Sequence, residues 1–87
     1  MIEVGQFVEI PPASPKGKPR VGIIVGICHD RRAIPRLVKV YIRTAHQVVG
    51  VPPKAVKAID CPPARKEGNT LVTGRGLVIS LETGYPV

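Results

Sequence analysis

The segment RVGIIVGIC, residues 20–28, decides the fold of this chain. Its side chains alternate at a period of two, which is the period of a β-strand. One face carries Val21, Ile23, Val25 and Ile27, and the other carries Gly22, Ile24, Gly26 and Cys28. The glycines on the second face predict strong bending or close approach by another backbone. The segment therefore predicts a core strand of a small, strongly curved sheet.

The composition of the whole chain also favours strands. Of the 87 residues, 44% are apolar but only 3% are aromatic, so the core consists mainly of Val, Ile and Leu, which favour strands. Ten prolines and nine glycines leave no room for long helices. We expect one all-β chain of short strands and loops.

Further strands are predicted on both sides of the central segment. Residues 4–10 and 37–43 alternate at a period of two, and residues 48–51 form a short apolar strand stopped by two prolines. Residues 11–19, PPASPKGKP, predict a long basic loop. Residues 52–59, PPKAVKAI, predict one tight helical turn before a short last strand.

This order of elements resembles an SH3-like small barrel of four to five strands with one short helical turn. The resemblance covers roughly residues 4–60, where VGQFVEI, a basic loop and then RVGIIVGI are similar to the opening of KOW-type and related SH3-like domains. The resemblance implies a fold and says little about activity. We expect the barrel to occupy residues 1–60.

A linker and a C-terminal β-hairpin are predicted after the barrel. The linker covers residues 61–69, and the hairpin lies in residues 70–87 around the turn Gly74-Arg75-Gly76, with a loose GYPV tail. The hairpin is too apolar to stand alone in water. Cover for it comes either from the barrel or from a second copy of the chain, so we expect a homo-oligomer.

Two segments are also similar to the plasmid-type (type II) dihydrofolate reductases, which are tetramers of an SH3-like barrel. These segments are GIIVGIC and residues 45–59, AHQVVGVPPKAVKAI. Where the family's pore carries a Val-Gln-Ile-Tyr motif, this chain has VVGV at residues 48–51, so the amide and the phenol used for cofactor and folate are missing. We expect a protein without catalytic residues or a cofactor, and an enzyme of this type is the third-ranked alternative.

Positive charge is concentrated in one part of the sequence. The chain has 13 Lys and Arg and 6 Asp and Glu, a net charge of +7. Residues 16–57 hold ten basic residues and one acid, Asp30, so this window alone carries +9. Charge kept only for solubility would not require nearly all acids to lie outside the window. The asymmetry therefore indicates a polyanionic partner.

The strand at residues 37–43 carries the most specific candidate site. Lys39, Tyr41 and Arg43 alternate on the face that points away from the predicted core. Nucleic-acid binders use an aromatic ring between cations, because the ring stacks on a base and the cations hold phosphates. The alternative is a solvated strand face whose charges protect an edge from aggregation.

The basic loops are expected to flank the same sheet and to extend this surface. Their phosphate-neutralising residues would be Lys16, Lys18, Arg20, Arg31, Arg32 and Arg36. The leading hypothesis is thus a module that binds RNA or DNA without strong sequence readout. The alternative from another class is a protein-interaction or homo-oligomeric assembly module that uses the apolar hairpin and the sheet edges.

Metal binding and membrane insertion are not expected. Cys28, His29, His46 and Cys61 have metal-ligating side chains, but their spacing fits no paired motif. Apolar runs in the chain fall well short of the roughly twenty residues that span a bilayer. We expect a cytoplasmic protein whose cysteines are reduced.

Overall fold

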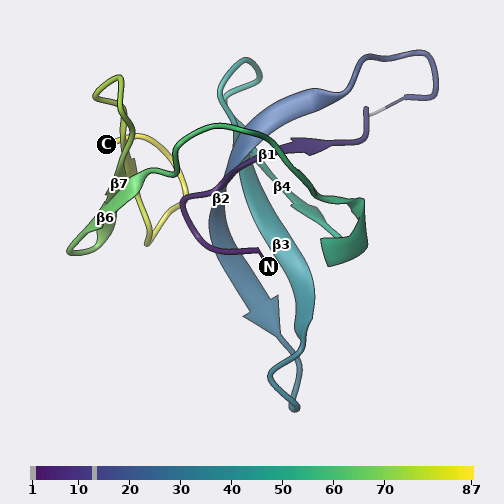
Figure 1. Cartoon of the computed structure of the whole chain (residues 1–87), viewed down its shortest axis with the longest axis horizontal. Helices are drawn as coiled ribbons and strands as arrows, with labels where there is room; N and C mark the ends of the chain where they lie inside the picture. The colour runs from purple at the N-terminus through teal and green to yellow at the C-terminus, as the bar shows by residue number, and fades with distance from the viewer. Residues whose placement is uncertain (1, 13) are drawn as a thin grey trace.

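The computed structural model describes residues 2–12 and 14–87, which form two antiparallel β-sheets (Figure 1). The larger sheet has the strand order β4-β3-β2-β1-β5, and the smaller has the order β6-β7-β8. The larger sheet contains β1 (Phe7–Ile10), β2 (Arg20–His29), β3 (Pro35–Ile42), β4 (Gln47–Val51) and β5 (Lys57–Ala58). The smaller sheet contains β6 (Arg65–Glu67), β7 (Thr70–Val72) and β8 (Val78–Ser80). The prediction of an all-β chain is confirmed.

The larger sheet is an open one within the residues that the structure describes. Strands β4 and β5 are its two edges and do not pair with each other. The predicted helical turn is present as a 3₁₀ turn, η1 (Pro53–Ala55), directly before β5. Within residues 2–12 and 14–87, no helix has the length and apolar character needed to cross a membrane.

Strand β2 carries a β-bulge that changes which side chains share a face. Ile24 and Gly26 pair with consecutive residues of β3, so Val25 is an extra residue between them. The extra residue reverses the alternation beyond it. Ile27 therefore packs beside Ile24, and the prediction that it shares a face with Ile23 and Val25 is wrong.

Both faces of the larger sheet are buried. One face curves over an aliphatic cluster made by Val8, Ile10, Ile24, Val38, Val40 and Ile42. The other face packs against the smaller sheet through a second cluster made by Ile23, Val25, Tyr41, Leu71 and Ile79. The apolar side chains of the C-terminal hairpin are therefore covered within the chain itself.

The C-terminal part is more ordered than the sequence predicts. The hairpin of β7 and β8 is confirmed, but β6 lies in the segment assigned to a linker. The expectation of a loose tail is wrong. The Val87 amide donates to the Val78 carbonyl at 3.0 Å, and Gly84 is buried against Val25 and Val48. The tail therefore ties the smaller sheet to β2 and β4.

Gly22 allows the backbones of β2 and β3 to approach closely, as its place in the sequence predicts. A Cβ atom at Gly22 would lie 2.6 Å from the Tyr41 carbonyl oxygen and would also overlap Val40. A Cβ atom at Gly26 would meet only the Lys39 side chain, at an ordinary 3.5 Å. The two glycines of β2 are thus not equivalent.

We predict that Gly22→Ala lowers the free energy of unfolding by about 1–3 kcal/mol, because overpacking forces the backbone to shift. The melting temperature should fall by roughly 4–8 °C for each kcal/mol in a chain of this size. Thermal unfolding followed by circular dichroism measures the change. Gly26→Ala is the matched control and should melt close to the original protein; equal destabilisation of both variants would refute the close-approach explanation.

We also predict that Ile79→Ala costs about 2–5 kcal/mol, the usual cost of truncating a fully buried aliphatic side chain. Ile79 is 0% exposed and joins the two sheets, so unfolding should remain one cooperative transition at a lower denaturant midpoint. The control is Val87→Ala, because Val87 is 88% exposed. Two separate transitions in Ile79→Ala would show that the sheets unfold independently.

Candidate functional site

Tyr41 lies on the predicted face of β3, but the expectation that this face is exposed is wrong for this residue. Tyr41 is only 2% exposed because the smaller sheet packs over it. Its ring makes an edge contact with Tyr85, with 6.0 Å between ring centroids. Its hydroxyl lies 3.0 Å from Nδ1 of His46. The ring is therefore part of the core and is not free to stack on a base.

The smaller sheet also separates the two cations on either side of Tyr41. Lys39 lies against Gly26 and lines a small cavity of about 100 Å³ together with Glu82. Arg43 lies at the other end, beside a much larger groove. Lys39, Tyr41 and Arg43 thus do not form one binding surface.

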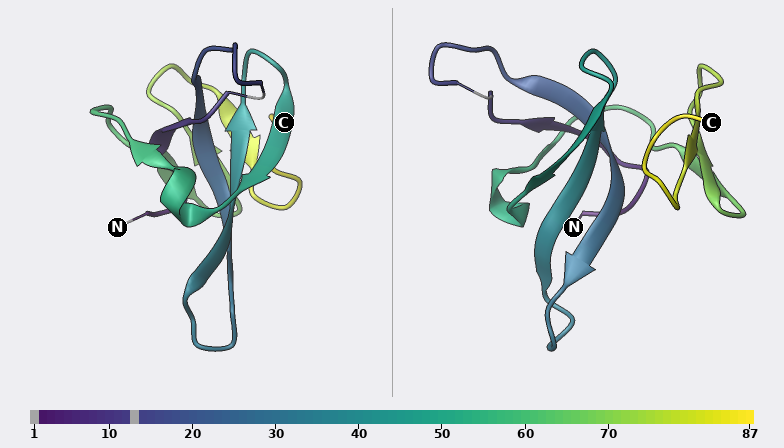
Figure 2. Two further views of the ribbon diagram at one scale, coloured as in Figure 1. Left: turned by 90° about the vertical axis from the view of Figure 1, so that its right-hand side faces the viewer. Right: turned by 180° about the vertical axis from the view of Figure 1, so that it is seen from behind.

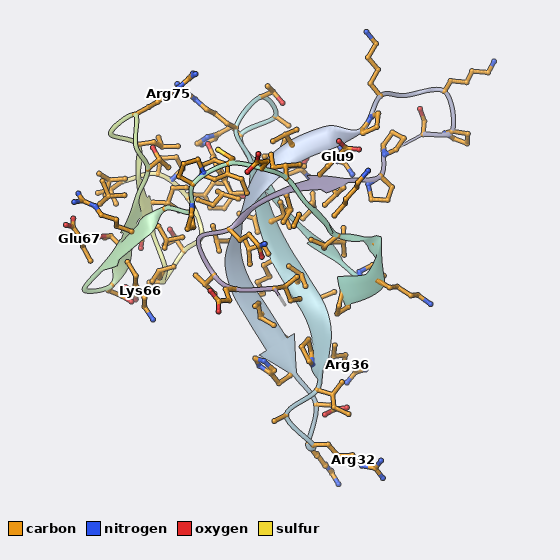
Figure 3. The ribbon with its side chains drawn as sticks, viewed as in Figure 1. Glu9, Arg32, Arg36, Lys66, Glu67 and Arg75 are labelled. Atoms are coloured by element: carbon orange, nitrogen blue, oxygen red, sulfur yellow. The ribbon has the colours of Figure 1, made fainter. Side chains whose placement is uncertain are left out.

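The basic loops do not extend a single patch either. Lys16 and Lys18 lie in the loop before β2, whereas Arg31 and Arg32 lie in the loop after it, at the opposite end of a ten-residue strand. Figure 3 shows Arg32 and Arg36 at one end of the molecule, and Figure 1 shows the loop between β1 and β2 at the other end of β2. Both loops adjoin the larger sheet, but at opposite ends, so the expectation that they extend one surface is wrong.

Within the part of the chain that the structure describes, Arg20 is the one predicted cation whose side chain makes a hydrogen bond to the protein. It is half-buried, and its Nη2 donates to the Pro11 carbonyl at 3.1 Å. This hydrogen bond ties the start of β2 to the end of β1 across the long basic loop. Arg20 is therefore better placed to hold that loop than to meet a ligand.

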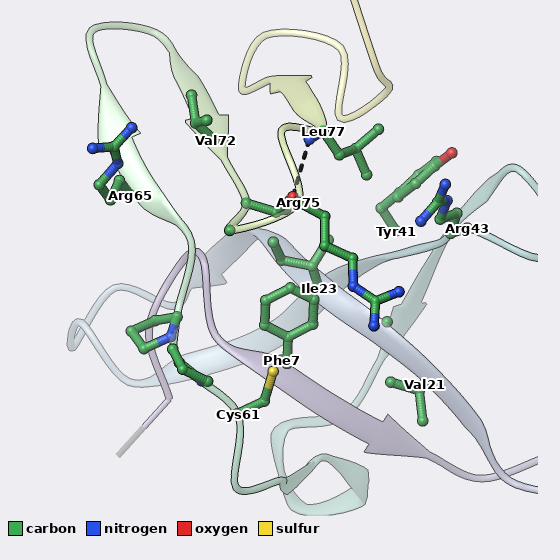
Figure 4. Close-up of a pocket in the computed structure, with 15 residues that line it drawn as sticks. Phe7, Val21, Ile23, Tyr41, Arg43, Cys61, Arg65, Val72, Arg75 and Leu77 are labelled. Carbon is green, nitrogen blue, oxygen red and sulfur yellow. Dashed lines mark hydrogen bonds between the residues drawn. The ribbon is translucent and has the colours of Figure 1, made fainter.

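A groove of about 740 Å³ opens between the start of β2 and the smaller sheet (Figure 4). Its apolar wall is formed by Phe7, Val21, Ile23, Tyr41, Val72 and Leu77. Cys61, Pro62 and Pro63, from the segment that joins the two sheets, form one rim. Three arginines complete the lining, and no described lining residue is acidic.

The three arginines, Arg43, Arg65 and Arg75, come from different elements. Arg43 follows β3, Arg65 lies in β6, and Arg75 lies in the turn between β7 and β8. In Figure 4 the Arg75 side chain extends from its turn over the groove, and Arg43 lies beside Tyr41. Guanidinium groups bind carboxylate or phosphate oxygens in a bidentate manner and stack on flat rings. The groove thus combines three cationic side chains with an apolar wall.

The turn that carries Arg75 is held in place by hydrogen bonds. The Leu77 amide donates to the Thr73 hydroxyl at 3.0 Å, and the Thr73 amide donates to the Leu77 carbonyl at 2.9 Å. Gly76 has φ of +87°, a conformation that favours glycine. Arg75 is therefore presented by a defined turn at the mouth of the groove.

Arg65 has an acidic neighbour, Glu67, at 3.5 Å. Both side chains are largely exposed, at 74% and 55%, and such surface pairs are worth less than about 1 kcal/mol. An anionic ligand can therefore replace Glu67 at little cost. Among the ion pairs of the described residues, Arg65 is the only groove arginine with an acidic partner, so Arg43 and Arg75 are the stronger candidates.

Sequence reasoning did not find most of this groove. Arg65 and Arg75 lie outside the basic window, and Gly74-Arg75-Gly76 predicts only a turn, which is confirmed. The available signal was a single arginine between two glycines at a hairpin turn. The four metal-ligating side chains named from the sequence are not gathered: among the described residues, no three of His, Cys, Asp or Glu lie close enough to hold a metal ion.

Comparisons of the chain with protein-family models, with curated proteins and with solved structures gave no match. Fold and groove geometry together define the class: an all-β protein with a basic, partly apolar groove between two sheets.

Proposed function

We propose that this protein is a non-enzymatic module that binds single-stranded RNA or DNA in the groove, without strong sequence readout. One observation carries the proposal: three arginines from three elements surround an apolar wall that includes Phe7, and no described lining residue is acidic. Proteins that bind single strands combine a positive groove with side chains on which bases stack. Both features are present in the same groove.

An unpaired strand suits this groove better than a duplex does. Bases must be unstacked to reach an apolar wall, and single strands expose them without the cost of opening a duplex. Phe7 offers a ring to a base, and Arg43 and Arg75 line the same groove, where they can meet phosphates of the strand. The Arg75 guanidinium can itself stack on a base.

We also propose that the larger sheet is an SH3-like barrel that remains open between β4 and β5. The order β4-β3-β2-β1-β5, the long loop between β1 and β2, and the 3₁₀ turn before β5 support this assignment. The strongly curved β2, with its bulge at Val25, is the device that such a barrel needs to fold over its own core.

Homo-oligomeric assembly stays a prediction, although the apolar hairpin does not require it. The hairpin residues Leu71 and Ile79 are fully buried against β2 and β3 of the same chain. A second copy is therefore not needed to cover them. Edge strands such as β4 remain as surfaces for strand addition.

We predict that replacing both groove arginines, Arg43→Gln and Arg75→Gln, weakens binding of a fluorescent single-stranded oligonucleotide by at least about tenfold at low salt. The slope of log K against log salt should become shallower by about 0.7 for each phosphate that the variant no longer neutralises. Fluorescence anisotropy titrations at several salt concentrations give both quantities.

Lys39→Gln with Lys54→Gln is the matched control, because it removes two charges that do not line the groove. Affinity close to that of the original protein is expected for this control. Equal weakening in the two double variants would mean that only net charge matters and would exclude the groove as the binding site. Binding of acidic peptides as tight as that of oligonucleotides would favour a protein partner instead.

A further inference from the structure

The hairpin formed by the ends of β2 and β3 projects well beyond the core. Every residue from 28 to 37 is exposed, although the strands on the core side of this segment are buried on both faces. Figures 1 and 2 show the hairpin as a two-stranded arm that extends away from both sheets. We refer to residues 28–37 as the arm.

The tip of the arm has a fixed conformation. One carboxylate oxygen of Asp30, Oδ1, accepts hydrogen bonds from the amides of Arg32 at 2.8 Å and Ile34 at 3.0 Å. The Asp30 amide donates to the Ile34 carbonyl at 2.9 Å, and Ala33 takes a positive φ of 60°. The single acid of the arm is therefore used to shape the turn. A preorganised tip loses less entropy when it binds.

The arm combines cations with exposed apolar side chains. Arg31, Arg32 and Arg36 are exposed, and Ile34 and Leu37 are 53% and 36% exposed. Arg36 is the extra residue of a second β-bulge, because Cys28 pairs with Leu37 and His29 with Pro35. A bulge redirects the side chain that it carries. The tip therefore presents an apolar side chain, Ile34, between the cations of the arm.

We propose that the arm enters the major groove of duplex DNA. A two-stranded β-ribbon fits the width of about 12 Å of this groove. Arg31, Arg32 and Arg36 would contact phosphates at the groove edges, and Ile34 would meet base edges such as the methyl group of thymine. The charge of the arm, three arginines against one hydrogen-bonded acid, complements the duplex.

The arm and the single-strand groove lie at opposite ends of β2. From Val21, which lines the groove, to Asp30 the chain advances nine residues, which span at most about 30 Å at 3.3 Å per residue. A duplex covers that distance in about nine base pairs at 3.4 Å each. We therefore infer a preference for a junction, with the unpaired strand in the groove and the duplex along the arm; this part of the inference rests on the proposed function.

The test compares three variants on separate single-stranded and duplex DNA probes. The arm variant is Arg31→Gln, Arg32→Gln, Arg36→Gln, and its matched control is Lys16→Gln, Lys18→Gln, Lys54→Gln, which removes three exposed charges elsewhere. The arm variant should weaken duplex binding by at least about tenfold and the control much less. The third variant, Ile34→Ser, should weaken duplex binding without changing the salt slope. Circular dichroism checks that each variant is folded.

Equal weakening by the arm variant and its lysine control would overturn the proposal. Equally tight binding of duplex RNA would also overturn it, because the deep, narrow major groove of A-form RNA does not admit a ribbon. The arm variant should leave single-strand affinity within about twofold, whereas Arg43→Gln with Arg75→Gln should affect only the single strand. These measurements therefore test separately the proposal that the groove binds single strands and the proposal that the arm binds duplex DNA.

The junction preference is tested with a DNA hairpin that carries a ten-nucleotide unpaired tail. A stem of twelve base pairs should bind at least about tenfold tighter than a stem of four, because only the longer stem reaches the arm. The arm variant should bind the two stems equally. Equal affinity of the original protein for the two stems would show that the groove and the arm do not act on one molecule and would overturn the junction preference.

Discussion

The structure depends on the burial of β2 on both of its faces. In ten residues this strand supplies Ile24 to the cluster inside the curved larger sheet and Ile23 and Val25 to the cluster between the two sheets. Ordinary alternation along the strand makes this division, and the bulge at Val25 then brings Ile27 to the side of Ile24. Burying apolar side chains on two sides gives a chain of this size a core that one sheet alone would not provide.

The two candidate binding surfaces lie where this double burial stops. At the start of β2 the cover by the smaller sheet becomes incomplete, and the exposed Val21 and the partly buried Phe7 line the groove beside the edges of the buried Ile23 and Tyr41. At the end of β2 both clusters end, and the paired strands continue into solvent as the arm. Strand β2, which is buried between them, sets the distance that a ligand must cover to reach both surfaces. The same packing that stabilises the fold therefore positions the sites.

Sequence patterns predicted the strands of the larger sheet, the 3₁₀ turn and the C-terminal hairpin, because these depend on local periodicity and on prolines and glycines. They also placed Tyr41 on the correct face of β3, but a period of two does not say what covers a face. The cover comes from Leu71 and Ile79, some thirty residues further along the chain. The basic window of the sequence does not form one surface either, because its loops lie at the two ends of the long strand β2 and do not meet in space.

The chemical identity of the cations supports two specific surfaces over a diffuse basic coat. The chain has seven arginines, of which Arg43, Arg65 and Arg75 line the groove and Arg31, Arg32 and Arg36 lie on the arm. The seventh, Arg20, is held by the Pro11 carbonyl. Within the described residues, the six lysines lie outside both surfaces. If the cations served only solubility, we would expect lysine and arginine to be distributed alike over the surface. Arginine alone offers a planar, bidentate and stacking group, so its concentration on the groove and the arm is consistent with the proposal that these two surfaces bind phosphates and bases.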